Sequence, residues 1–469
     1  MSETLDPRDV LIAELYEVIK GLRATVARLE ARVTELEAQL QTNSSNSSKP
    51  PSSDGPGVQR APKAKPSGKS RGGQLGHKAH VRKLSEPTEV VRHEPSECGS
   101  CGSALSASDA ASEDGAIWEV AELPELRAHI THHVPVGRRC RCGHATRGVI
   151  PAPISCRGYG PRFSALVSFL MTRFGLSRRD VVESAATMFG IVVSSGTVCA
   201  LASEMGESLS ASHAEALASV QASPVAHADE TGWKTAKKRG YLWVGLGQEA
   251  TVFLASMHRS RASAHALLGA TFAGTLVSDR YNAYGFLPLV RRQLCLAHLL
   301  REAKKMALRG GKGAAVGRGL AVTFRAAIAL FHRPGAALGT LAERGKNVKT
   351  QCDDWLARGA ALTEPRDAEA KGLCVRLQGL RTALWTFLTT PGVEPTNNPA
   401  ERAIRPAVIV RKSSFGSDTE KGALHFARIL TAIATLRRQG RSVLDFLNGT
   451  IAAGRAGLAK PKLLAEAAG

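Results

Sequence analysis

Apolar residues near the N-terminus recur at alternating steps of three and four, which is the heptad pattern of a coiled coil. The pattern predicts a leucine zipper over residues 8–42 that joins two or more copies of the chain. The alternative is a single amphipathic helix packed on its own domain. The a positions are Ile12, Ile19, Val26, Val33 and Leu40, and the d positions are Leu15, Leu22, Leu29 and Leu36.

A polar, Pro-broken and then basic stretch follows over residues 43–90. Residues 55–85 contain no acid and eight Lys or Arg residues. This composition predicts a flexible arm that contacts DNA phosphates without reading sequence. A linker that only adds solubility is the alternative. The cations in the middle of the arm are Arg60, Lys63, Lys65, Lys69 and Arg71.

The pattern becomes helical over residues 155–215, with a helix expected at 178–189, a short turn, and a second helix from 195 to 205. This order is typical of a helix-turn-helix module that binds DNA. A helical subdomain without a DNA-binding role remains open, because the second helix carries few side chains suited to reading base edges.

An alternating, β-rich pattern marks residues 220–300, the first part of a predicted catalytic core. One short strand ends at Asp229, two more span 241–246 and 251–256, a helix covers 262–272, and a further strand ends at Asp279. A ribonuclease-H-like sheet begins in this order. Its first and fourth strands are parallel neighbours, so Asp229 and Asp279 are expected side by side. Two such carboxylates repel each other unless cations lie between them.

Residues 301–395 read as a helical insertion, and 396–455 as the second part of the core. In the second part Asn398 is expected to cap a helix that begins at Pro399 and carries Glu401 at its third position. Glu401 on its own could equally close a capping box with Asn398. A last helix is expected at 422–437 and a frayed tail at 456–469. The insertion helices are expected at 299–308, 319–331, 334–344, 349–358 and 368–388.

Cysteine spacing points to a metal site. Cys98 and Cys101 form one Cys-x2-Cys knuckle, and Cys140 and Cys142 form a shorter pair followed by His144. The spacing predicts a zinc-ribbon-like module over 91–150, and a metal-free remnant is the alternative because the second pair is one residue short. A further pair, Cys295-x2-His298, lies at a predicted strand-to-helix junction, where structural packing is expected more than metal binding.

Composition narrows the function classes. The chain has 469 residues, and 62 Lys and Arg against 41 Asp and Glu give a net charge of +21, which favours a polyanionic partner such as nucleic acid. An odd number of cysteines, nine, in a long chain favours a reducing compartment over a disulfide framework. No apolar run reaches the ~18 residues of a membrane span, so we expect a cytoplasmic, nucleoid-associated protein without a membrane partner.

Four segments, HADETGW, VSDRYNAY, CLAHLLREAKK and NNPAERAIRP, occur in an order that resembles the DDE transposases of the insertion-sequence 66 family. The resemblance covers nearly the whole chain and implies that Asp229, Asp279 and Glu401 form the catalytic triad. The short Cys140–Cys142 pair and an Ala/Arg-rich insertion depart from the family pattern. Cations that follow the third acid are suited to phosphates beside the cleaved bond, and these are Arg402, Arg405, Arg411 and Lys412.

The resemblance implies a transposase that cleaves double-stranded DNA at element ends and transfers the 3′-hydroxyl into target DNA. Two Mg2+ ions, or Mn2+ in their place, would serve this chemistry, with structural Zn2+ in the cysteine module and small accessory transposition proteins as further partners. The expected fold is multidomain, α plus α/β. The alternatives are a ribonuclease-H-like nuclease or resolvase that does not join DNA, and a non-catalytic DNA-binding regulator.

Overall fold

The computed structural model describes residues 7–40, 83–110, 116–151, 154, 158–333 and 338–464. The chain divides into two compact units, residues 59–129 and residues 1–58 with 130–469. Its architecture is mixed α and β, as the sequence predicts. The five cations named in the basic arm lie outside the described residues, so a role for Arg60, Lys63, Lys65, Lys69 and Arg71 stays a prediction.

The predicted N-terminal helix is confirmed as α1, Pro7–Leu40. All nine a and d side chains of the heptad pattern are exposed, from Leu36 at 43% to Leu40 at 87%. A continuous apolar stripe on a helix this long is typical of a surface that packs against another helix. The dimer through this stripe stays a prediction.

Each predicted cysteine knuckle contains a tight turn. In the first, the Gly102 N–H donates to Cys98 O at 2.9 Å, and Cys101 lies within the same turn. The second joins two short antiparallel strands, β1 (Gly137–Arg139) and β2 (Ala145–Arg147). There the Gly143 N–H donates to Cys140 O at 2.9 Å. The two pairs belong to different units, and their sharing of one zinc ion stays a prediction.

The helical region begins with α2 (Pro161–Phe169), which continues into one π-helical turn, η2 (Leu170–Phe174). The two helices predicted next are confirmed as α3 (Arg178–Phe189) and α4 (Ser195–Ser208), and α5 (Ser210–Ala222) follows. Side chains that accept backbone N–H groups fix both predicted starts, Ser177 for α3 and Ser194 for α4.

The central sheet has the strand order β5-β4-β3-β6-β7. Strands β3, β4 and β5 are antiparallel neighbours, whereas β6 lies parallel to β3, and β7 lies parallel to β6. The predicted parallel pairing of the first and fourth strands is therefore confirmed. The strands are β3 (Val225–Gly232), β4 (Tyr241–Leu246), β5 (Thr251–Ser256), β6 (Thr275–Ser278) and β7 (Arg292–Leu294).

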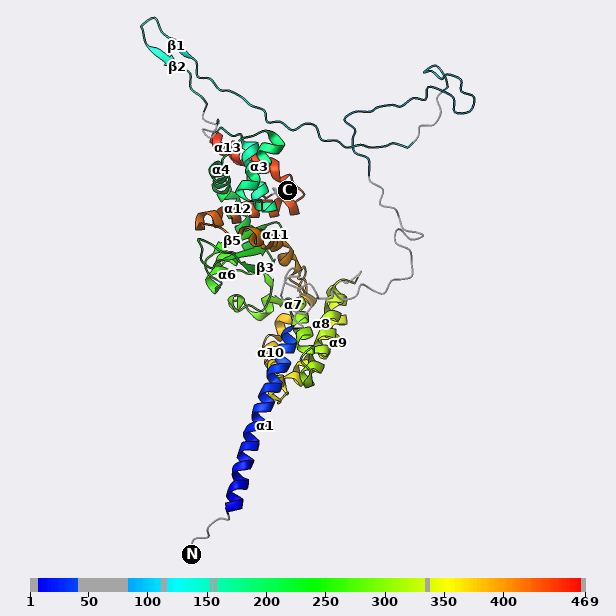
Figure 1. Ribbon diagram of the computed structural model, residues 1–469, viewed down its shortest axis with the longest axis vertical. Helices are drawn as coiled ribbons and strands as arrows, with labels where there is room; N and C mark the ends of the chain where they lie inside the picture. The colour runs from blue at the N-terminus through cyan, green and yellow to red at the C-terminus, as the bar shows by residue number, and fades with distance from the viewer. Residues whose placement is uncertain are drawn as a thin grey trace. The chain divides into compact units, whose positions relative to one another are not determined.

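Helices cover both faces of this sheet (Figure 1). Side chains alternate along β4, so Leu242 and Val244 pack with α11 (Asn398–Ser414) and α12 (Glu420–Arg438), while Trp243 belongs to the core beneath α5 and α6. Helix α6 (Arg261–Leu268) ends four residues before the predicted end. The cause is Gly269, whose φ of +84° cannot continue a helix.

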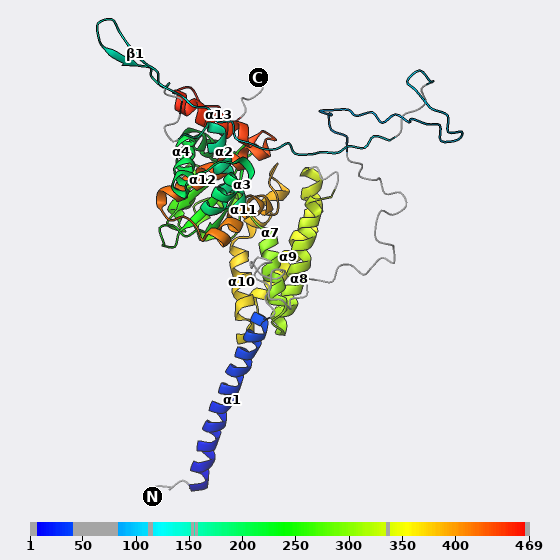
Figure 2. The same cartoon turned by 45° about the horizontal axis from the view of Figure 1, so that its top comes forward.

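The insertion forms its own helical layer, in which α7, α8 and α9 lie side by side (Figure 2). Helix α8 is long and apolar enough to cross a membrane by length and composition. Its most apolar window is 50% buried inside the protein, as in the core helix of a soluble protein. The helices are α7 (Leu296–Ala307), α8 (Gly311–Phe331), α9 (Leu338–Ala360) and α10 (Ala368–Gly379), with a 3-10 turn at Pro365–Asp367.

Several insertion predictions were wrong. The helix expected at 319–331 begins eight residues earlier, at Gly311. The helices expected at 334–344 and 349–358 are one helix, α9, because Gly345 does not break it but lets Leu388 approach its backbone closely. The helix expected at 368–388 ends at Gly379, and 3-10 turns follow at Arg381–Leu384 and Thr386–Leu388. The Phe387 N–H donates to Gln293 Oε1 of β7 at 2.9 Å, so this backbone bonds to the sheet instead of continuing a helix.

The frayed tail predicted from 456 was also wrong for its first residues. After α13 (Val443–Ala456), Leu463 is fully buried, and its backbone N–H donates to Glu215 Oε2 at 3.1 Å. Arg441 donates to Leu463 O at 2.6 Å. These bonds anchor the segment on α5, and residues 465–469 lie outside the described part of the chain.

Candidate active site

Asp229 and Asp279 come from the two central parallel strands. The register pairs His227 of β3 with Val277 of β6. Asp229 comes two residues after His227, and Asp279 comes two residues after Val277. Asp229 lies within β3, and Asp279 follows the last residue of β6. Both acids therefore lie at the same end of the sheet, and both are partly buried.

Glu401 reaches the site from the first turns of α11. The predicted cap was wrong by one residue, because the N-cap is Asn397 and the helix begins at Asn398. Glu401 does not close a capping box. Its Oε1 instead lies 3.4 Å from Arg301 Nη2 and 3.3 Å from His298 Nδ1.

Asn397 fixes the start of α11 against the sheet and is fully buried. Its side chain donates to Ala228 O at 2.8 Å, and its backbone N–H donates to Cys295 Sγ at 3.1 Å. Its Oδ1 lies 3.2 Å from His227 Nδ1, which therefore carries the hydrogen. Burial lowers the pKa of His227 to about 4, so this imidazole is neutral near pH 7. These bonds hold the helix that carries Glu401 beside the strand that carries Asp229.

The negative charges of the three acids act on one another. Burial raises the pKa of Asp229 well above its usual range, and the charges of Glu230, Asp279 and Glu401 raise it further. A hydrogen bond from the Glu230 N–H to Asp229 Oδ1, at 2.9 Å, opposes part of this rise. Asp229 and Asp279 thus lie at one end of the sheet, and the charge of Glu401 acts on Asp229. Among the described residues, however, the oxygens of the three acids do not all lie within 4.8 Å of one another, so their convergence on one metal site stays a prediction.

The adjacent acid, Glu230, has a different environment. Its carboxylate accepts from Arg259 Nε at 2.8 Å and from the Tyr284 hydroxyl at 2.9 Å, and its side chain is only 2% exposed. Burial and the charge of Asp279 raise the pKa of Glu230, and its contacts with Arg259 and Tyr284 oppose part of this rise. Within the described ranges, Asp229 and Asp279 form no such ion pair. Carboxylates such as Asp229, Asp279 and Glu401 are the donor type that divalent hard cations prefer, because the cation relieves their repulsion. Binding of one metal site by these three acids stays a prediction.

The four cations predicted to follow Glu401 lie along α11. Arg402 and Arg405 are exposed on the helix, and Arg402 borders a hollow of about 410 Å³ together with Arg173, Arg437 and Arg438. Arg411 Nη1 donates at 2.8 Å to both Thr231 Oγ1 and Gly232 O, so it ties α11 to the end of β3.

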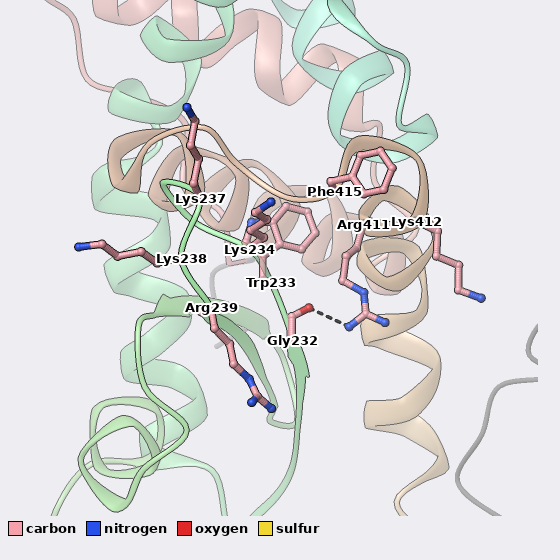
Figure 3. A pocket seen from close by; sticks show the side chains of 10 residues that line it. Gly232, Trp233, Lys234, Lys237, Lys238, Arg239, Arg411, Lys412 and Phe415 are labelled. Atoms are coloured by element: carbon pink, nitrogen blue, oxygen red, sulfur yellow. Dashed lines mark hydrogen bonds between the residues drawn. The ribbon is translucent and has the colours of Figure 1, made fainter.

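A second hollow of about 530 Å³ lies where the β3–β4 hairpin meets the end of α11 (Figure 3). Lys237, Lys238 and Arg239 are exposed and extend from the hairpin in different directions. Phe415, at the end of α11, is 73% exposed. We call this the basic hollow, and its charged lining residues are Lys234, Lys237, Lys238, Arg239, Arg411 and Lys412.

The backbone around the basic hollow is strained. Ala236 and Lys237 occupy the two central positions of the hairpin turn with φ of 49° and 63°, and Phe415 has φ of 59°. Such left-handed conformations cost energy for residues other than glycine and cluster at functional sites. The segment after Phe415 holds the turn in place, since the Ala236 N–H donates to Ser417 O at 3.0 Å.

Several of these residues escaped the sequence analysis. The run KTAKKRG was visible as a basic cluster, but nothing in the sequence placed it beside Arg411 and Phe415. Asn397 was visible only as a helix start. Its contacts with Ala228 and Cys295 cross long stretches of chain, so no local pattern could reveal them.

Comparison with known proteins identifies a class of nucleic-acid-processing enzyme and the family within it. Residues 159–425, more than half of the chain, match the family described as "Transposase IS66 family". The chain therefore belongs to the IS66 transposase family, as the sequence motifs suggested. The matched range contains Asp229, Asp279 and Glu401.

Two further similarities cover other parts of the chain. Residues 3–83 match a "Family of unknown function (DUF6444)". "Uncharacterized protein y4qI" of Sinorhizobium fredii is 29% identical over 197 residues, which cover 39% of this chain and 36% of that protein. The alignment thus spans about a third of that relative's length.

Proposed function

We propose that this protein is the DNA transposase of an insertion sequence. In this proposal it cleaves DNA at the element ends and joins the exposed 3′-hydroxyl to target DNA through Asp229, Asp279 and Glu401. Membership of the IS66 family supports the transposase function. The observation that supports the catalytic assignment is that Asp229 and Asp279 lie at the same end of the parallel strands β3 and β6, while Asn397 bonds the start of the Glu401 helix to β3.

Asp229, Asp279 and Glu401 would hold Mg2+, or Mn2+ in its place. When bound, the metal ions would activate the attacking oxygen and stabilise the leaving oxygen of an in-line phosphoryl displacement. Arg259 forms an ion pair with Glu230, whereas Asp229 and Asp279 have no such partner among the described residues. Asn397 keeps the Glu401 helix against β3. Arg301 partly balances Glu401 in the metal-free form.

The strand order supports a ribonuclease-H-like core, with the insertion between β7 and α11. Three antiparallel strands followed by two parallel ones place the first two acids at adjacent strand ends. The capped pair α3 and α4 is compatible with a helix-turn-helix module upstream of this core.

The basic hollow is suited to the DNA near the cleaved bond. Gly232, which lines it, is three residues beyond Asp229 along β3, or about 10 Å at the rise of a strand. Its lysines and arginines can bind phosphates, and the exposed ring of Phe415 can stack on an unpaired base. Arg402 and Arg405 extend this basic surface along α11.

Self-association and zinc binding complete the proposal. A transposase must hold two element ends together before it joins them, and the exposed stripe of α1 is suited to a dimer or a higher oligomer. The Cys98–Cys101 and Cys140–Cys142 turns, with His144, offer ligands for structural Zn2+. We place the protein in the cytoplasm with the nucleoid, where small accessory proteins can assist it.

The direct test is cleavage and joining of labelled element-end DNA in Mg2+ by the full chain. Asp229→Asn is expected to reduce both steps by about 10³-fold or more, because it removes an electrostatic contribution to the transition state. DNA binding should be retained. The matched control is Glu249→Gln, which removes an exposed acid from the β4–β5 turn of the same sheet.

Three results would contradict parts of this proposal. Undiminished cleavage by Asp229→Asn would refute the triad. Cleavage without joining by the parent would indicate a nuclease or resolvase. Binding of element ends without any cleavage in Mg2+ or Mn2+ would indicate a non-catalytic regulator.

A further inference from the structure

A second group of metal-ligating atoms lies beside the carboxylates. Cys295 Sγ, a ring nitrogen of His298 and a carboxylate oxygen of Glu401 all lie within 4.8 Å of one another. Sequence alone favours structural packing for Cys295 and His298. The structure adds Glu401 from a distant element as a third ligand, and three ligands of this kind with one open position are typical of a zinc site.

The cluster is rigidly held. Cys295 is the N-cap of α7, and His298 lies in the first turn of that helix. The Leu296 N–H donates to Pro395 O at 2.8 Å, and the Asn397 N–H donates to Cys295 Sγ at 3.1 Å. Backbone N–H groups that donate to sulfur stabilise thiolate ligands, so Asn397 already supplies the outer contact that a metal-bound cysteine uses.

The imidazole of His298 has an unsatisfied nitrogen. Its Nδ1 is buried and, among the described residues, has no hydrogen-bond partner, although Glu401 Oε1 lies 3.3 Å away. A buried polar atom without a partner is costly, and a bound ion would satisfy it.

Access to the cluster is one-sided. Cys295 is 1% exposed, whereas the side chains of His298 and Glu401 are 24% and 31% exposed. An ion can therefore enter from the side of His298 and Glu401 and keep a water molecule as a fourth ligand. Sulfur and imidazole ligands favour Zn2+ over Mg2+, which prefers oxygen alone.

We infer that Cys295, His298 and Glu401 bind one Zn2+ ion, and that this ion withholds Glu401 from Asp229 and Asp279. The second half of the inference rests on the proposed function. Glu401 belongs to both groups of ligands. Zn2+ bound by Cys295, His298 and Glu401 therefore lowers the affinity of Asp229, Asp279 and Glu401 for Mg2+. Zinc bound here inhibits the Mg2+-dependent reaction, and Arg301 releases Glu401 as the ion binds.

The binding test uses Co2+ alone as the probe, because a thiolate bound to Co2+ gives a charge-transfer absorption. The protein is the full chain with Cys98, Cys101, Cys140 and Cys142 all replaced by Ser, so that the predicted zinc ribbon does not contribute. We expect this band to saturate at one Co2+ per chain. Cys295→Ser should abolish it, while Cys352→Ser, which changes an equally buried cysteine of α9, should leave it unchanged.

His298→Gln provides a second variant that retains the thiol. It should weaken Co2+ binding by about 100-fold or more, since losing even an outer contact to a metal ligand costs about 10- to 100-fold. The inferred zinc site would be refuted if the chain without the four ribbon cysteines gave no charge-transfer band, or if the band persisted in Cys295→Ser.

The inhibition test measures cleavage in Mg2+ with and without added Zn2+, each variant being compared with its own activity in Mg2+ alone. The chain without the four ribbon cysteines should be inhibited, and Cys295→Ser in that background should lose most of the inhibition. Co2+ binding without inhibition by Zn2+ would overturn the regulatory half. A chain that binds Co2+ at Cys295 but never cleaves DNA would refute the proposed function and leave the metal site standing.

Discussion

The two ends of α11 carry opposite charge and are held in different ways. Glu401 lies near the beginning of the helix and Arg411 near its end, ten residues or about 15 Å further on. At the first end, Asp229 and Asp279 have no ion-pair partner in the described chain, and burial together with the charges of neighbouring acids raises the pKa of Asp229. At the other end, Arg411 is held by hydrogen bonds to Thr231 and Gly232.

The contrast shows how a basic protein keeps an acidic site. With a net charge of +21, nearby lysines and arginines could neutralise the carboxylates and exclude a metal ion. Arg259 is bound to Glu230, and Arg411 is bound to the backbone of β3. In the proposed function the acidic end binds metal ions and the basic hollow binds phosphates. The two ends can be changed separately.

The largest effect expected from changing the basic end is on DNA affinity. Replacing Lys237, Lys238 and Arg239 together with Ala should weaken binding by roughly 10- to 100-fold. It should also reduce the slope of log affinity against log salt concentration by up to roughly 2.7, because each phosphate contact contributes about 0.9 to that slope. Cleavage at saturating DNA should change little. The readout is binding of element-end DNA across a salt series, together with cleavage under saturation.

The control for that triple variant removes equal charge from α9, where Arg344, Lys346 and Lys349 are also exposed. If both triple variants lose the same affinity and slope, the hollow contributes only general positive charge and has no special role in binding.

A separate effect, confined to DNA with unpaired bases, is expected from Phe415. If its exposed ring stacks on an unpaired base, Phe415→Ala should weaken binding of element ends with a single-stranded tail by about 1–3 kcal/mol. Phe415→Trp should retain the affinity. A fluorescent adenine analogue at each tail position would locate the stacked base through its quenching. Equal loss in both variants would favour a structural role for Phe415 at the end of α11.

The smallest effect concerns stability at the acidic end. Because folding raises the pKa of Asp229, its charged form costs stability above the unfolded value of about 4, and this cost grows as the pH rises towards the folded value. In EDTA at pH 7, Asp229→Asn should therefore raise the free energy of unfolding by about 1.4 kcal/mol per pKa unit removed. Denaturant titration beside Glu249→Gln measures this change, and a less stable Asp229→Asn protein would contradict the raised pKa of Asp229.

Local patterns predicted much of the fold because the relevant signals are local. Strands β4 and β5 begin and end where their alternation and turns placed them, and Ser177 and Ser194 start α3 and α4 as capping residues do. The errors arose where tertiary contacts override local preference. Gly345 permits close packing inside α9, and Gln293 draws the segment after α10 onto the sheet.

The candidate site also has one part that the sequence could predict and another that depends on tertiary contacts. Asp229 and Asp279 could be paired from sequence because strand order fixes their neighbourhood, whereas Glu401 needed the family resemblance. The environment of each acid could not be predicted. Whether Glu230 or Asp229 is neutralised depends on Arg259 and Tyr284, which reach Glu230 from other elements.

Metal specificity tests the central claim, that the acids are metal ligands, most directly. Asp279→Cys replaces one oxygen ligand with sulfur, which Mn2+ accepts more readily than Mg2+. Cleavage of labelled element ends should be lost in Mg2+ and partly restored in Mn2+, so that the ratio of the Mn2+ rate to the Mg2+ rate rises above the parent's. Asp279→Ser should be inactive with both ions. An unchanged ratio in Asp279→Cys, or equal recovery in Asp279→Ser, would show that Asp279 does not bind the catalytic metal.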